Sequence, residues 1–283
     1  MELIRQLDLD KLIRRALAED IGNGDITTAA TVSTARRASA LIVVKEKEGI
    51  IFCGGFVLQR VLAMAGGDPV VESLAGERAQ LERGAIVAEI SGALAGLLMG
   101  ERTALNFVQL MSGVATLTSR YVQAVAGTRA KIVDTRKTHP GLRALEKYAV
   151  RAGGGSNHRF GLDSGVLIKE NHIAAAGGVR EALECVRRTV PHTFRVEIEC
   201  ETLAQVETAV KNGATAILLD NMSLVEMRDA RAMVGDSITL EASGGVTLET
   251  VRRIAETGVD LISVGALTHS AKAVDLSMRV EAA

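Results

Sequence analysis

The sequence predicts an α/β protein in two parts, an α+β region followed by a region in which strands and helices alternate. Beyond Gly127, apolar runs of about four to six residues alternate with longer helical patterns. Before that point the chain shows β-rich pieces separated by glycine-containing turns. The chain has 283 residues, and at about 150 residues per domain this length favours roughly two domains.

The composition is that of an ordinary globular protein, with 47% hydrophobic and 24% charged residues. The 33 basic residues nearly balance the 34 acidic ones, and there are two tyrosines, five phenylalanines and no tryptophan. A broad basic surface with aromatic stacking platforms for nucleic acid is therefore not expected. Any anion-binding site in this chain must be local.

The sequence also favours a soluble protein of a reducing cytoplasm. Charged residues interrupt the apolar positions of the first 20 residues, so no export signal is expected. The longest weakly polar run, residues 90–100, is well short of the roughly 20 residues that cross a bilayer. The three cysteines form no CxxC motif or Cys/His cluster, which argues against a disulfide framework and against a zinc site.

The first region begins with an expected amphipathic helix over residues 2–20, where apolar residues recur at near-helical spacing. Between residues 38 and 90, the pieces ALIVVKEKEGIIF and GAIVAEISG predict strands, with a helix around residues 56–65. The segment ERTALNFVQLMSGVATLTSRYVQAVA then predicts a long helix that leads into the second region. We place the domain boundary near residue 105.

The second region contains six apolar runs that predict buried parallel strands: KIVD, VLIK, FRVEIE, AILLD, SITLEAS and LISVG. Right-handed crossovers between them allow either a small barrel or an open doubly wound sheet. Chemistry-bearing residues at the strand ends favour the barrel, whose active site lies at the carboxyl ends of its strands. These ends hold Asp134, Lys169, Glu199, Asp220, Ser243 and Gly265.

Basic residues are concentrated between Arg129 and Arg159, where eight Lys or Arg and two His accompany two acids. This concentration indicates an anionic ligand. Arg136 and Lys137 follow the strand KIVD directly, which places them at the rim of the predicted barrel. The spacing of three other residues is instead typical of a solvated helix face: Arg143, Lys147 and Arg151.

The segment AGGGSNHRFG is either a flexible loop or a ligand-binding loop. Its three glycines allow the backbone to approach a ligand closely and direct N–H groups at an anion. His158 and Arg159 follow at once in a basic neighbourhood, which favours a binding function. The planar guanidinium of an arginine suits a carboxylate, whereas the ammonium of a lysine suits the spread charge of a phosphate.

Three charged residues end neighbouring predicted strands and suggest a polyphosphate site. Lys169 ends VLIK, and an ammonium at that place must stay hydrated or paired. Glu199 and Asp220 end two consecutive strands, so a barrel brings both carboxylates to one mouth, as hydrated Mg²⁺ bound to phosphates prefers. Surface exposure of Lys169 and simple ion pairing are the alternatives.

The last two strands end in EASGGV and SVGA, whose small residues match the phosphate site that many α/β barrels build from their final loops. Together with the basic cluster and the acid pair, this pattern predicts phosphoryl or phosphoribosyl transfer.

The ordered words DTRKTHPGLR, GGGSNHRFGL, LIKENHI, VEIECET, ILLDNM and EASGGV resemble the quinolinate phosphoribosyltransferase family, the carboxylating nicotinate-nucleotide pyrophosphorylases. ALAEDIGNGDITT and ERTALNFVQLMSGVAT extend the resemblance over nearly the whole chain. It implies an N-terminal α/β sandwich domain over residues 1–105, completed by a C-terminal helix over 268–283. An incomplete TIM-like α/β barrel, the type II phosphoribosyltransferase fold, follows over residues 106–267. The resemblance also implies a homodimer, or a higher oligomer, with its sites between subunits.

The reaction implied is that of a pentosyltransferase in pyridine nucleotide biosynthesis. Quinolinate and phosphoribosyl pyrophosphate (PRPP) give nicotinate mononucleotide, CO₂ and pyrophosphate with Mg²⁺, as the entry into NAD. The residues implied to bind quinolinate are Thr135, Arg136, His158, Arg159, Lys169 and, from the neighbouring subunit, Arg102. Those implied to face PRPP are Lys137, Glu199, Asp220, Ser243, Gly244, Gly245 and Gly265, with Mg²⁺ on Glu199 and Asp220. The catalytic set is Lys137, Lys169, Glu199 and Asp220.

Three other functions remain open from the sequence. A molybdenum-transport-associated relative shares the TRKT word but diverges at NHR and KENH, both intact here. A barrel aldolase would use Lys169 as a Schiff-base nucleophile. A non-enzymatic phosphometabolite-binding protein would keep the glycine loops without needing Glu199 and Asp220.

Overall fold

The computed structural model describes residues 9–281, and their contacts divide the chain into two compact units. The first unit takes the chain up to residue 119, residues 139–154 and the chain from residue 267 onward, and the second takes residues 120–138 and 155–266. Residues 2–8 of the expected first helix lie outside the described residues. No helix within residues 9–281 is both long and apolar enough to cross a membrane.

The first unit is built on a four-stranded antiparallel sheet with the order β12-β1-β5-β3. Its strands are β1 (Arg37–Val44), β3 (Val70–Leu74), β5 (Ile86–Ala93) and β12 (Leu276–Glu281). The helices and small strands are α2 (Leu9–Ile21), α3 (Ile26–Thr31), α4 (Gly55–Met64), α5 (Leu94–Ala124), α6 (Arg143–Ala152), β2 (Ile50–Ile51) and β4 (Gln80–Leu81). The predicted helices at the N-terminus, around 56–65 and after Gly100 correspond to α2, α4 and α5.

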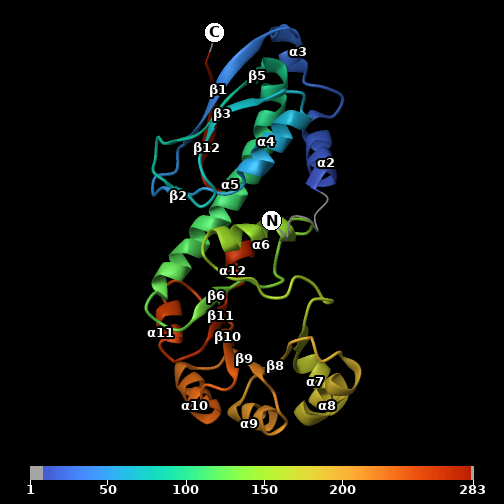
Figure 1. The fold of residues 1–283 in the computed structure, drawn as a ribbon, viewed down its shortest axis with the longest axis vertical. Helices are drawn as coiled ribbons and strands as arrows, with labels where there is room; N and C mark the ends of the chain where they lie inside the picture. Colours follow the sequence, from blue (N-terminus) through green and yellow to red (C-terminus); the bar gives the residue numbers. More distant parts are fainter. Residues whose placement is uncertain (1–8, 282–283) are drawn as a thin grey trace. The chain divides into compact units, whose positions relative to one another are not determined.

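The expectation of a C-terminal helix over residues 268–283 is wrong. The chain forms β12 there, and Figure 1 shows this red strand beside the blue β1. The segment LSMRVE alternates apolar and polar residues with a period of two, which suits a strand with one packed face. The end of the chain groups with the first unit, where it forms an edge strand.

The C-terminal segment is fixed on α5 before it enters the sheet. Val274 N–H donates to the carbonyl of Gln109 at 3.1 Å, and Gln109 Nε2 donates to the carbonyl of Leu276 at 3.0 Å. Gly113 makes this close approach possible, because a Cβ there would lie 2.1 Å from the carbonyl oxygen of Lys272. The long helix therefore sets the register at which β12 meets β1.

The second unit contains a six-stranded parallel sheet with the order β6-β11-β10-β9-β8-β7. The strands are β6 (Lys131–Val133), β7 (Val166–Ile168), β8 (Val196–Cys200), β9 (Ala216–Asp220), β10 (Thr239–Ser243) and β11 (Leu261–Ser263). The helices after β7 are α7 (Glu170–Ala176), α8 (Val179–Thr189), α9 (Leu203–Lys211), α10 (Leu224–Val234) and α11 (Val251–Ala255), and α12 (Ala266–His269) follows β11 where the chain passes into the first unit. All six predicted strands are present.

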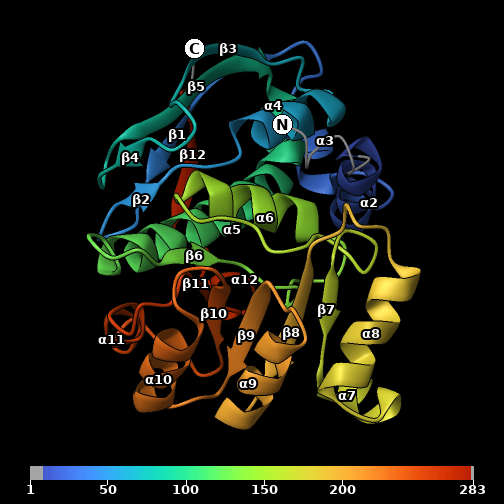
Figure 2. The ribbon, with the colours of Figure 1, turned by 60° about the horizontal axis from the view of Figure 1, so that its bottom comes forward.

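The strand order identifies a barrel that is open between its first two strands. From β7 to β11 each strand pairs with the next in sequence, and β6 then pairs with β11 instead of β7. A doubly wound sheet would reverse direction at an inner strand, whereas this order runs one way. Helices α8, α9 and α10 lie side by side over the outer face (Figure 2). Alternate residues of each strand therefore point into the barrel interior.

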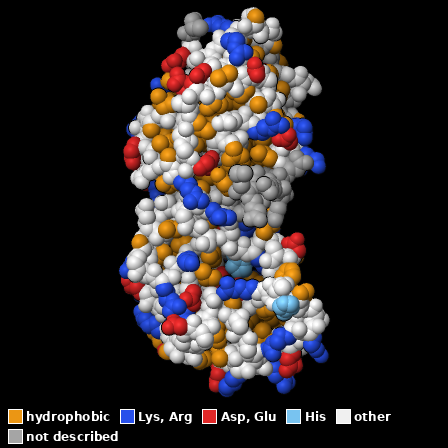
Figure 3. Space-filling model, viewed as in Figure 1, with side chains coloured by type: hydrophobic (Ala, Val, Ile, Leu, Met, Phe, Trp, Pro, Cys, Tyr) orange, Lys and Arg blue, Asp and Glu red, His pale blue; other side chains and the backbone are white. Residues whose placement is uncertain are grey.

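One helix face differs from its sequence prediction. Lys147 of α6 is completely buried, although the four-residue spacing of Arg143, Lys147 and Arg151 predicts a solvated face. Arg151 is exposed, as that spacing predicts. On the face drawn in Figure 3, basic and acidic side chains are interspersed, in keeping with the nearly balanced charges of the chain.

Candidate active site

The carboxyl ends of the second unit's strands surround a cavity of about 590 Å³. The loops after β6, β7, β9 and β10 contribute to its wall together with Glu199 of β8, as expected for a barrel whose strands all end on the same side. The predicted residues that line it are Thr135, Arg136, Lys137, His158, Arg159, Lys169, Glu199, Asp220, Ser243, Gly244 and Gly245. Residues from about 110 positions of sequence thus meet at one place.

Two predicted residues are not in the wall of this cavity. Gly265 is partly buried in the turn between β11 and α12. Arg102 lies exposed on α5 of the first unit, and its expected role in a neighbouring subunit stays a prediction.

Arg159 is prepared to bind an anion. Its Nη1 donates to the carbonyl of Gly165 at 3.0 Å, whereas its buried Nε–H has no hydrogen-bond acceptor within the described residues. Burial, and then the positive charge of Arg136, lowers the pKa of Arg159. Because a buried donor without an acceptor is unfavourable, a ligand carboxylate between these arginines would stabilise the site.

A second charged group lies at the ends of β7, β8 and β9. The Nζ of Lys169 is 3.3 Å from Oε2 of the buried Glu199. Burial raises the pKa of Glu199; Lys169 opposes this shift and the nearby charge of Asp220 adds to it. Two carboxylates at one mouth are a suitable donor set for Mg²⁺, which keeps several waters and binds phosphates alongside one or two carboxylates.

Asn221 joins the ends of β9 and β10. Its backbone N–H donates to the carbonyl of Ser243 at 2.9 Å, and its Nδ2 donates to Oδ2 of Asp220 at 2.8 Å. The residue has a φ of 55°, a left-handed conformation that asparagine tolerates better than most residues. Its Oδ1 lies 2.0 Å from where a Cβ of Gly244 would be, so only glycine fits at 244. Sequence analysis did not single out Asn221.

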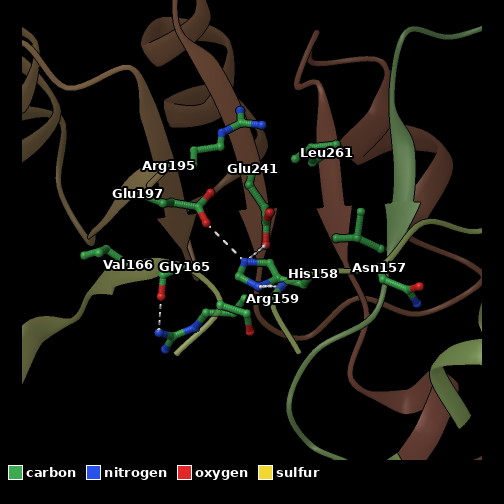
Figure 4. Close-up of a pocket in the computed structure, with 11 residues that line it drawn as sticks. Asn157, His158, Arg159, Gly165, Val166, Arg195, Glu197, Glu241 and Leu261 are labelled. Atoms are coloured by element: carbon green, nitrogen blue, oxygen red, sulfur yellow. Dashed lines mark hydrogen bonds and ion pairs between the residues drawn. The ribbon is translucent and has the colours of Figure 1, made fainter. Parts of the chain in front are cut away.

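A buried acidic cluster was also missed. Figure 4 shows Glu197 of β8 and Glu241 of β10 pointing at His158. His158 Nε2 lies 3.1 Å from Oε2 of Glu197 and 3.7 Å from Oε1 of Glu241, beside a smaller cavity of about 300 Å³. The sequence could have indicated both acids through the strand period of two, because Glu197 shares a face with Glu199, and Glu241 with Ser243. Among the described residues this trio also has ligand atoms close enough to hold a metal ion.

Asp134, which ends the predicted strand KIVD, does not line the cavity. Asp134 is fully buried, and its carboxylate accepts hydrogen bonds from Asn157 Nδ2 at 2.5 Å and from the backbone N–H of His158 at 2.9 Å. Its role is structural, because these hydrogen bonds hold the loop at Asn157 and His158 against the end of β6.

Gly244→Ala is expected to weaken anion binding at the β10 end of the cavity. The added Cβ collides with Asn221, and the φ of 97° at this position is strained for alanine. We expect inorganic phosphate, titrated by calorimetry, to bind at least about tenfold more weakly. The matched control is Gly177→Ala, which has a φ of 94° but no atom within 4 Å of its Cβ and is not in the cavity wall. Equal affinity in both variants would contradict this assignment.

Glu241→Gln should change how stability depends on pH. Burial, and then the charge of Glu197, raises the pKa of Glu241 from 4.5 to about 7. Between these values the unfolded chain releases a proton that the folded protein retains, so the stability of the wild type falls as the pH rises. Relative to the wild type, the unfolding free energy of the variant should increase by up to about 3 kcal/mol from pH 4.5 to 7.

Urea unfolding at a series of pH values measures this difference. Glu184→Gln, at an exposed acid of α8, serves as the control and should leave the pH dependence of the wild type unchanged. Parallel curves for the wild type and Glu241→Gln would contradict burial of an ionisable group at this position.

Comparison with known proteins agrees with this geometry. Residues 25–112 match the N-terminal domain of quinolinate phosphoribosyl transferase, and residues 114–279 match its C-terminal domain. A probable nicotinate-nucleotide pyrophosphorylase [carboxylating] of Bacillus subtilis is 43% identical over 98% of this chain and 95% of its own length. The structure of the nicotinate-nucleotide pyrophosphorylase from Francisella tularensis superposes with a TM-score of 0.90 at 36% identity and covers 96% of each chain. The chain belongs to the quinolinate phosphoribosyltransferase family.

Proposed function

We propose that this protein transfers the phosphoribosyl group of PRPP to the ring nitrogen of quinolinate and releases CO₂ and pyrophosphate. The product is nicotinate mononucleotide, the precursor of NAD. The observation that carries the proposal is the cavity itself, which holds a pair of arginines for a dicarboxylate together with an acid pair and a glycine loop for a polyphosphate. Relatives named for this activity match the chain over nearly its whole length.

On the quinolinate side, Arg136, Arg159, Lys169 and Thr135 are the proposed ligands of the two carboxylates. The unpaired Nε–H of Arg159 offers a donor that a carboxylate can satisfy, and Arg136 adds charge next to it. His158, which the family resemblance also implies as a quinolinate ligand, lies in the same wall, but its two ring nitrogens face Glu197 and the backbone of Arg159, so it is not among the proposed ligands.

On the PRPP side, Lys137, Glu199 and Asp220 would face the pyrophosphate, and the 5′-phosphate would lie against Ser243, Gly244, Gly245 and Gly265. Mg²⁺ fits Glu199 and Asp220, because hard carboxylate oxygens from two adjacent strands open into one cavity. The chemistry it supplies when bound is neutralisation of the charge on the leaving pyrophosphate. Lys137 adds a positive charge at the same end.

The reaction needs no strong general base. The pyridine nitrogen carries a lone pair that attacks C1 of the ribose as pyrophosphate departs with the bonding electrons. The resulting cationic ring nitrogen stabilises the carbanion left at the adjacent carbon when CO₂ leaves, and that carbon then takes up a proton. Cations that only held the carboxylate tightly would stabilise the ground state and would not accelerate the loss of CO₂. The chain therefore contributes by positioning the substrates, by placing charge and by excluding water.

The aldolase alternative is not supported at Lys169. A Schiff-base lysine is normally desolvated or placed beside another cation. The side chain of Lys169 is 49% exposed and its ammonium lies 3.3 Å from the carboxylate of Glu199.

The direct test is to incubate the purified protein with quinolinate, PRPP and Mg²⁺ and to follow nicotinate mononucleotide and carboxyl-labelled CO₂ together. Nicotinate replaces quinolinate as the control substrate. Formation of both products with quinolinate, but not with nicotinate, supports the proposal. A folded sample that binds PRPP without turnover would contradict it.

Substitutions on the two sides of the cavity should separate the two substrates. Arg136→Ala or Arg159→Ala should raise the KM for quinolinate by roughly tenfold or more, since each removes a charged hydrogen-bond donor. Lys137→Ala or Glu199→Ala should act mainly on the KM for PRPP. Steady-state kinetics with each substrate varied in turn measures both constants, and equal losses for both substrates would refute this division.

We also propose a cytoplasmic homodimer in which Arg102 reaches the site of the partner subunit. Arg102→Ala and Lys169→Ala chains, each inactive alone, should then regain activity when mixed and refolded together, because a hybrid contains one intact site. The measurement is activity against mixing ratio, with Arg120→Ala replacing Arg102→Ala as the control partner. Absence of recovery would mean that each site is complete within one chain.

A further inference from the structure

The hydrogen bonds of His158 fix which ring nitrogen carries the proton. The backbone N–H of Arg159 donates to Nδ1 at 2.8 Å, and since a backbone N–H can only donate, Nδ1 must hold a lone pair. The proton of the neutral ring therefore lies on Nε2, which faces the carboxylates of Glu197 and Glu241 at 3.1 and 3.7 Å. Protein atoms engage both nitrogens, so neither is directed at a ligand.

The two acids that face Nε2 are rigidly placed. Both lie within strands and point into the barrel interior, as Figure 4 shows. Glu241 is only 1% exposed, and neither of its carboxylate oxygens has a hydrogen-bond donor within the described residues. Burying two carboxylates costs desolvation free energy, which an apolar pair at the same positions would avoid. Their presence therefore suggests a role that requires hydrogen-bond acceptors. The imidazole N–H is the group that both of them face.

The chain next to His158 is held from the other side as well. Its own backbone N–H donates to Oδ1 of Asp134 at 2.9 Å, and Arg159 Nη1 donates to the carbonyl of Gly165 at 3.0 Å. The hydrogen bond to Nδ1 in addition fixes the peptide group between His158 and Arg159. The peptide bonded to Nδ1 thus belongs to Arg159, which lines both cavities.

We propose that Glu197 and Glu241 are positioning residues that act on the dicarboxylate substrate through His158 and Arg159. By accepting from Nε2–H they keep the lone pair on Nδ1, and the peptide bonded to Nδ1 presents Arg159 to the carboxylate. Glu197 is the principal acceptor because it lies within hydrogen-bonding distance, and Glu241 supplies a second negative charge. The assignment of the substrate rests on the proposed function, whereas the tautomer does not.

The test compares Glu197→Leu with Glu197→Gln. Leucine removes the acceptor, so the KM for quinolinate should rise at least about tenfold while the KM for PRPP changes less than about twofold. Glutamine retains an oxygen that accepts from Nε2–H, so it should restore the KM to within about threefold of the wild type. Glu241→Gln, which loses only the charge, should have a smaller effect than Glu197→Leu.

Nitrogen NMR of labelled histidine provides the readout that a merely structural role would not change. The wild type and Glu197→Gln should show the Nε2–H tautomer at His158, and Glu197→Leu should lose it. Asp260→Asn is the control for stability, because Asp260 pairs with Arg129 and Arg231 at the amino end of β11, away from the cavity wall. It should lower the melting temperature without changing either the KM for quinolinate or the tautomer.

Three results would overturn the proposal: a wild-type tautomer in Glu197→Leu, a glutamine variant as impaired as the leucine variant, or stoichiometric zinc bound to the wild type and lost from Glu197→Gln and Glu241→Gln. The last result would make the trio a metal site. If the wild type does not turn over quinolinate, the proposed function fails, and the NMR comparison still decides whether the acids set the tautomer.

Discussion

The parallel direction of all six strands in the second unit is the constraint on which the rest of the site depends. Right-handed crossovers return the chain to the same side of the sheet after every helix, so each strand ends at the same rim. Residues as distant in sequence as Thr135 and Gly245 thereby line one cavity. No short-range interaction could bring two arginines, a lysine, two acids and a glycine loop together.

The site maintains charges that are unfavourable without a ligand. Arg159 and Arg136 repel each other, Arg159 keeps a buried donor without an acceptor, and burial together with the charge of Asp220 opposes the ionisation of Glu199. The surrounding barrel supplies the stability that holds these groups in place. Such unfavourable local interactions are expected at a site that binds charged ligands, and the proposed substrates are both anions.

Behind the residues of the cavity wall, other polar side chains hold the site residues in place. Asn221 connects Asp220 to the loop at Gly244, and Glu197 and Glu241 face His158. Asn221 thus positions Asp220 directly, and the two acids are proposed to position Arg159 through His158. Precision of this kind requires supports within strands or directly at their ends, because a loop alone would allow displacements that cost much of the binding energy.

The sequence by itself determined the six parallel strands, the long helix and the residues at the strand ends, because short apolar runs and their order are local properties. The sequence also identified the family, through motifs whose residues meet in one cavity. Only the tertiary structure decided which face each side chain uses. Asp134 turned inward to fasten a loop, Lys147 is buried, and LSMRVE became an edge strand because β1 offers it a partner. Pairing and barrel closure set these orientations, and both depend on contacts far apart in the chain.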